Sequence, residues 1–101
     1  CILAVKKGKS YSQLIRMIEP YVHEFIFTAF TSDIPDTVYT AADPQILANA
    51  TRRQYRVVPS PKRALSEAKT VSRKTGFPVL VTGSLYLVGE IRSFLKQRRI
   101  H

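Results

Sequence analysis

A Thr-Gly-Ser turn between an apolar run and a helical pattern is the part of this sequence with the clearest chemical use. Val79 to Val81 is apolar, as in a strand buried on both faces of a parallel sheet, and Thr82, Gly83 and Ser84 follow it directly. Glycine lets backbone approach a ligand closely, serine can cap the helix that follows, and the exposed amides of a helix start favour an anion. From the residues alone, this turn is either an anion site or an ordinary strand-to-helix joint, which every α/β protein needs.

A second group of polar residues, Lys6 to Ser10, follows the first apolar run at residues 2–5. In α/β sheets, ligands gather at the carboxyl ends of the strands, so we expect this turn to lie near residues 82–84. A lysine such as Lys9 would hold a carboxylate or a phosphate there as a point charge. The alternative is a solvated basic loop without a ligand.

The elements that must position these turns alternate between strand and helix. Apolar runs predict strands at residues 2–5, 23–30, 56–58 and 79–81. Helical spacing and capping signals predict four helices. The first covers residues 11–22 and is bent or ended by Pro20, the second runs from Asp43 and Pro44 through Ala50, and the third runs from Ser60 and Pro61 to Gly76. The fourth runs from Ser84 through Leu95, with Ser84, Val88, Ile91 and Leu95 on one apolar stripe. An irregular loop is expected at residues 31–42 and a frayed tail at 96–101. The pattern predicts an α/β fold, a Rossmann-like three-layer domain with a mostly parallel sheet and helices on both faces.

Length and composition limit the chain to one small domain, residues 1–101. The sequence is 45% hydrophobic and contains no apolar run close to the roughly 20 residues of a membrane span. Cys1 is the single cysteine, so no intrachain disulfide can form, and no cysteine and histidine set has zinc spacing. We therefore expect a cytoplasmic domain without a membrane partner or a structural metal.

The string TGSLYLVGEIR at residues 82–92 resembles a signature near the C-terminus of folylpolyglutamate synthases and dihydrofolate synthases, which are members of the Mur ligase superfamily. The resemblance covers only the last domain of those longer enzymes, so we expect an upstream ATP-binding domain to be missing from this sequence. In agreement, no phosphate-binding P-loop is present. Gly8-Lys9-Ser10 lacks the first glycine of that motif, because no glycine precedes Gly8.

The resemblance implies an ATP-dependent ligase that adds glutamate to folate or dihydropteroate through an acyl phosphate. The domain would then have the fold of a Mur ligase C-terminal domain, help to position glutamate and close the interdomain ATP site, while ATP and Mg²⁺ are held in the full-length parent. The implied substrate-binding residues are Ser84 and the amides of Gly83 and Leu85 for a carboxylate, Lys9 for an anion, and Thr82 as support for the turn. No catalytic or metal-binding residue is implied in this part, and the domain alone is expected to be inactive.

Two departures from the family pattern affect this expectation. The turn that usually reads Asp-Lys-Asp in the resembling enzymes has Gly8 and Ser10 in place of the two acids around Lys9. A later loop that commonly carries an Arg-Ala pair reads Asp36 to Tyr39 instead. Any role of those acids and of that arginine is therefore not transferred to this chain.

The charge balance supports a rival interpretation. Sixteen lysines and arginines against seven acids give a formal net charge of +9, which is compatible with a stand-alone basic α/β module that binds nucleic acid or another polyanion. The basic residues are spread over several predicted elements and form no stripe interleaved with aromatic residues. We therefore expect the ligase domain rather than a nucleic-acid partner.

Overall fold

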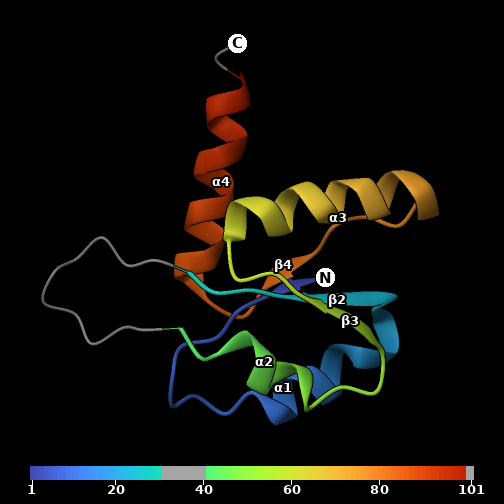
Figure 1. Ribbon diagram of the computed structural model, residues 1–101, viewed down its shortest axis with the longest axis vertical. Helices are drawn as coiled ribbons and strands as arrows, with labels where there is room; N and C mark the ends of the chain where they lie inside the picture. The colour runs from blue at the N-terminus through green and yellow to red at the C-terminus, as the bar shows by residue number, and fades with distance from the viewer. Residues whose placement is uncertain (31–40, 100–101) are drawn as a thin grey trace, which may run out of the picture.

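A computed structural model describes residues 1–30 and 41–99, which form a four-stranded sheet with helices on both sides (Figure 1). In chain order the elements are β1 (Ile2–Leu3), α1 (Ser12–Ile18), the 3-10 helix η1 (Glu19–Tyr21), β2 (Glu24–Phe27), α2 (Pro44–Ala48), β3 (Gln54–Val57), α3 (Pro61–Thr75), β4 (Val81–Thr82) and α4 (Leu85–Arg99). All pairings within the sheet are parallel, in the order β3-β2-β1-β4. The predicted Rossmann-like α/β class is confirmed.

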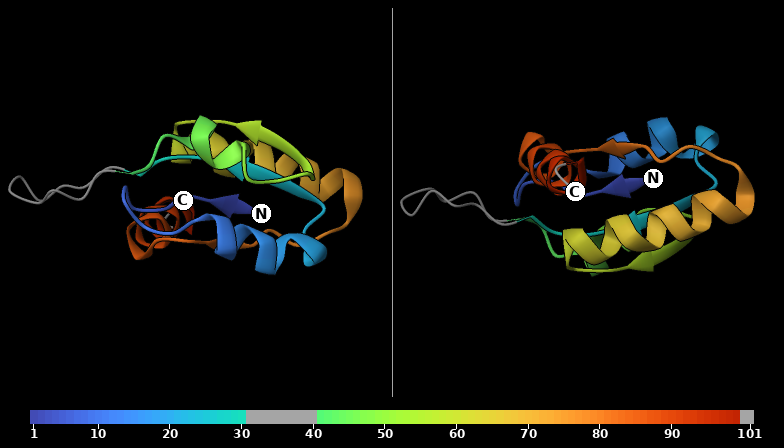
Figure 2. Two further views of the ribbon diagram at one scale, coloured as in Figure 1. Left: turned by 90° about the horizontal axis from the view of Figure 1, so that it is seen from below. Right: turned by 90° about the horizontal axis from the view of Figure 1, so that it is seen from above.

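The helices cover the sheet in two layers, which Figures 1 and 2 show from three directions. Side chains alternate along the strands, so that Leu3, Phe25 and Phe27 pack with residues of α1 and α2, whereas Ile2 and Ile26 pack with residues of α3 and α4. This arrangement follows from the topology. Right-handed crossovers from β1 to β2 to β3 place both helices on one face, and the crossover from β3 back to β4 places α3 on the other.

Three capping signals in the sequence act where they were predicted. The carboxylate of Asp43 accepts a hydrogen bond from the Gln45 amide at 2.9 Å, and the Ser60 hydroxyl accepts one from the Arg63 amide at 3.3 Å. Gly76 ends α3 in a left-handed conformation, with φ of 79°. These local interactions fix where α2 and α3 begin and where α3 ends.

Pro20 ends the α-helical part of the first helix, because α1 stops at Ile18 and continues as the 3-10 turn η1. β1, β2 and β4 are shorter than their apolar runs, whereas β3 begins two residues before its predicted start and ends one residue earlier. His23, predicted as the first residue of a strand, lies on the surface just before β2. In the part of the chain that the structure describes, no helix is both long and apolar enough to cross a membrane.

The last helix differs from its prediction in two respects. Its buried side chains are Leu87 and Ile91, with Phe94 partly buried against them, whereas Leu95 is 40% exposed. The helix also continues to Arg99 through most of the predicted frayed tail. Figure 1 shows why the stripe was misplaced: α4 runs away from the sheet and crosses α3 steeply, so tertiary packing decides which side is covered.

Candidate functional site

The register of β1 and β4 brings the predicted polar turns to one edge of the sheet. Leu3 of β1 pairs with Thr82 of β4, and both strands end at these residues. The loop that contains Lys9 and the turn that contains Ser84 therefore leave neighbouring strand ends at the carboxyl edge, where α/β sheets bind ligands.

Gly83 joins these two strand ends by direct packing. Its φ is +106°, a conformation that L side chains rarely adopt, and a Cβ at this position would overlap the carbonyl oxygen of Ala4. The same Cβ would lie 3.1 Å from the carbonyl carbon of Ala4 and from Cδ1 of Leu3. The close approach that the glycine allows is therefore to the backbone after β1, and it fixes the β4-α4 turn against that strand end.

The turn opens directly into α4. The helix begins at Leu85, and the Val88 amide donates a hydrogen bond of 3.1 Å to the Ser84 carbonyl, which places Ser84 at the N-cap position. Thr82 and Ser84 are half-buried and Gly83 is exposed. Because amides of the first helical turn have no partner within the helix, the start of α4 directs backbone donors toward this edge of the sheet.

The neighbouring loop contributes positive charge. Lys7 and Lys9 are exposed, and the Lys9 amide donates to the Lys6 carbonyl at 3.1 Å across Gly8, whose φ is 90°. On the other side of β1 the chain returns from the predicted loop at 31–42, of which residues 31–40, including the departure at residues 36–39, lie outside the described part. Ala42 donates its amide to the Val5 carbonyl at 2.8 Å.

The donor set of this edge suits an anion and does not suit Mg²⁺. Lysine ammonium groups and backbone amides hold carboxylates or phosphates, whereas Mg²⁺ needs oxygen ligands, above all carboxylates. Within residues 1–30 and 41–99, no three histidine, cysteine, aspartate or glutamate side chains gather as a possible metal site. The residues present therefore fit a nucleotide phosphate or a substrate carboxylate, and a magnesium ion would need ligands from elsewhere.

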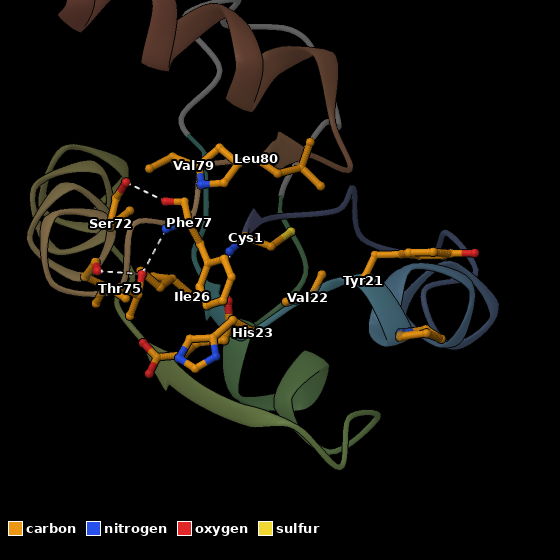
Figure 3. A pocket seen from close by; sticks show the side chains of 15 residues that line it. Cys1, Tyr21, Val22, His23, Ile26, Ser72, Thr75, Phe77, Val79 and Leu80 are labelled. Atoms are coloured by element: carbon orange, nitrogen blue, oxygen red, sulfur yellow. Dashed lines mark hydrogen bonds between the residues drawn. The ribbon is translucent and has the colours of Figure 1, made fainter.

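A cavity of about 530 Å³ lies at the opposite, amino edge of the sheet (Figure 3). Its lining includes Cys1, Tyr21, His23, Phe77 and Leu80, and the rings of His23 and Phe77 are 5.1 Å apart. The backbone nitrogen of Cys1 donates a hydrogen bond to the Glu24 carbonyl at 2.8 Å. The sequence did not predict this cavity, because its walls come from several separate elements.

The comparison with protein families gives one match. The family described as dihydrofolate synthetase, C-terminal domain, matches residues 1–97. No curated protein and no solved structure matches the chain.

Proposed function

The chain belongs to the dihydrofolate synthetase C-terminal domain family, and on this basis we propose that it serves an ATP-dependent ligase that joins glutamate to dihydropteroate or folate. The matched residues include the string at 82–92 from which the resemblance was first inferred. The match extends over nearly the whole chain, so the assignment does not depend on that string alone.

The observation that carries the proposed role is the packing of Gly83 on Ala4, which holds the β4-α4 turn beside the end of β1. A carboxylate of glutamate bound at this turn would accept hydrogen bonds from the amides of Gly83 and Leu85 and from the Ser84 hydroxyl. Thr82 supports the turn from β4, and Lys9 supplies a positive charge for a second anionic group. Charge-assisted hydrogen bonds of this kind are roughly twice as strong as neutral ones.

In the proposed reaction the carboxylate of the pteroate-type substrate takes the γ-phosphoryl group of ATP and becomes an acyl phosphate. The amine of glutamate then attacks the acyl carbon, the amide bond forms, and inorganic phosphate leaves as the amine loses a proton. An upstream ATP-binding domain of the same polypeptide would hold ATP and Mg²⁺. This domain would orient glutamate and exclude water when the two domains close, which favours attack by the amine over hydrolysis.

The test is a Ser84→Ala variant in the full-length parent enzyme. We expect the KM for glutamate to rise about tenfold, as for loss of one hydrogen bond to a charged group, with the KM for ATP unchanged. Ser93→Ala is the matched control, because Ser93 is an exposed serine of the same helix, about two turns from its start. The 101-residue chain assayed beside the parent should give no turnover.

Two results would contradict the proposal. Unchanged kinetics in Ser84→Ala would remove Ser84 from the glutamate site, and turnover by the 101-residue chain above background would show that no upstream domain is needed.

The second candidate function is a stand-alone module that binds a polyanion. It is favoured by the net charge of +9 and by the five lysines and arginines that the structure places on the single helix α3.

A further inference from the structure

The outer face of α3 gathers cationic side chains that the sequence showed only as scattered pairs. Five of the fifteen residues of α3 are lysine or arginine, and one, Glu67, is acidic. The helix packs on the sheet through Ala64, Leu65 and Ala68. Its cations lie away from that side: Lys62, Arg63, Arg73 and Lys74 are exposed, and Lys69 is half-buried. We call these five residues the α3 basic face.

The acids near this face do not neutralise it. Glu67 lies on the flank of α3 toward β3, where its carboxylate accepts a hydrogen bond from Arg56 at 3.3 Å. Arg56 in turn pairs with Glu24 at 2.9 Å. Among the described residues, Lys62, Arg63, Arg73 and Lys74 take part in no ion pair with an acid.

The first two cations of this face stand where helix stability disfavours them. Lys62 and Arg63 follow Pro61 in the first turn of α3, which contains no acidic residue. The positive end of the helix dipole favours acids at such positions and is repelled by lysine and arginine. Arg73 and Lys74, in the last turn, suit the dipole. The charge at Lys62 and Arg63 therefore does not stabilise α3 through the helix dipole.

From this arrangement we propose that the α3 basic face binds the phosphate backbone of double-stranded nucleic acid without reading its sequence. Lys62 and Lys74 are twelve residues apart, which corresponds to about 18 Å along an α-helix. A duplex carries one negative charge per ~1.7 Å of its axis, so a stretch of duplex as long as this helix carries about ten phosphates, of which those on one side can face α3. Figure 2 shows α3 lying along the outside of its layer, in the view from above, with α4 beside its first turns.

Other polyanions fit this face less well. A membrane-bound helix inserts apolar side chains, but the apolar side of α3 is already used against the sheet. Single strands bind by stacking bases on aromatic side chains, and α3 contains none. Tyr55 of neighbouring β3 packs beside Phe27, which belongs to the core on the α1 and α2 side of the sheet, so its ring does not belong to the α3 basic face. A charged face without exposed apolar or aromatic groups suits backbone contacts to a duplex.

The test measures fluorescence anisotropy of a labelled 20-base-pair DNA duplex, and of the corresponding RNA duplex, with increasing amounts of the chain. If the four exposed cations contact phosphates, the slope of log K against log salt should be about −3.6, which weakens binding roughly 100-fold between 50 and 200 mM salt. The triple variant Lys62→Gln, Arg63→Gln, Arg73→Gln should bring the slope close to −1 and weaken binding at 50 mM salt more than tenfold.

The matched control carries the same loss of charge elsewhere: Arg16→Gln, Arg52→Gln, Arg53→Gln, of which Arg16 lies on α1 across the sheet. It should keep most of the affinity and slope. Circular dichroism and a melting curve check the fold of both variants. Removal of Lys62 and Arg63 from the first helical turn should leave stability unchanged or higher, so that a loss of binding cannot be ascribed to unfolding.

Three results would overturn the proposal. One is no binding of either duplex at 50 mM salt, and another is an equal loss in both triple variants, which would mean that only net charge matters. The third is displacement of the duplex by poly-L-glutamate at equal concentration of charge, which would indicate an acidic polypeptide as the partner. None of these results depends on ligase activity, so failure here leaves the proposed ligase role intact.

Discussion

Substitution of Gly83 by alanine tests the contact on which the carboxyl edge depends. The new Cβ would be held at φ of +106° and would overlap the Ala4 carbonyl oxygen. A side chain in this backbone region costs about 1–3 kcal/mol, and forcing the β4-α4 turn away from Ala4 costs about 1–3 kcal/mol more. We expect a loss of about 4 kcal/mol, a large part of the ~5–15 kcal/mol that stabilises a typical domain.

Two other glycines serve to separate the conformational cost of a side chain from the cost of its overlap with Ala4. Gly76 has φ of +79° with nothing within 4 Å of its added Cβ, so Gly76→Ala should carry only the conformational cost of about 1–2 kcal/mol. Gly89 lies inside α4 with open space around its added Cβ, and Gly89→Ala should stabilise the domain by about 0.5–1 kcal/mol.

Urea unfolding followed by circular dichroism gives the three free energies under one condition. For a domain of this size, a loss of about 4 kcal/mol lowers the midpoint of thermal unfolding by about 15–30 °C. If Gly83→Ala costs no more than Gly76→Ala, the packing of the turn on Ala4 is not what holds this edge together. A loss of glutamate use in the parent enzyme without a loss of stability would also refute the reasoning.

Two further predictions concern ionised groups. Hydrogen bonds from the Thr51 hydroxyl at 2.7 Å and the Arg52 amide at 3.1 Å hold the pKa of Glu19 below its ordinary value. The ionised Glu19 therefore adds to the free energy of unfolding at pH values above its ordinary pKa, and this addition is lost as the pH falls through the lowered pKa. The stability difference between the parent chain and Thr51→Val should therefore shrink in acid; a difference independent of pH in urea titrations would contradict this. Arg56→Ala should cost about 1–2 kcal/mol, because it leaves the Glu24 carboxylate, whose side chain is 13% exposed, without its partner; the half-exposed guanidinium limits the effect. Unfolding of the double variant Arg56→Ala, Glu24→Gln should recover part of the loss.

Local signals in the sequence predicted the elements well where neighbouring residues determine them. The caps at Asp43 and Ser60 and the stop at Gly76 depend on contacts within a few residues, and the structure confirms each of them. The predicted stripe of α4 was right at Ile91 and wrong at Leu95, because Leu87 and Ile91 are the buried ones among the described side chains of this helix. Which side of the helix is buried depends on how α4 crosses α3.

The site was predicted only in part, for the same reason. The sequence identified Gly83 as a position that needs glycine, but its neighbour Ala4 lies at the other end of the chain. The α3 basic face was missed because its charges were counted along the chain and not around the helix. The cavity at the amino edge is lined by Tyr21 and Phe77, two exposed aromatic residues. Tyr21 was wrongly predicted on the apolar face of the first helix, whose α-helical part ends at Ile18, so the signal available for the cavity was Phe77, which lies outside the predicted helices.

The pairing of Ile2 with Val81 has a consequence for how the domain is made. β1 lies between β2 and β4, so its second neighbour is synthesised last among the strands. At about 5–20 residues per second, a ribosome needs several seconds between the two partners. During that time one edge of β1 stays open, and the sheet closes late through a contact of high sequence separation, which slows folding. The domain therefore has a translation interval in which chaperones or neighbouring segments can reach its central strand.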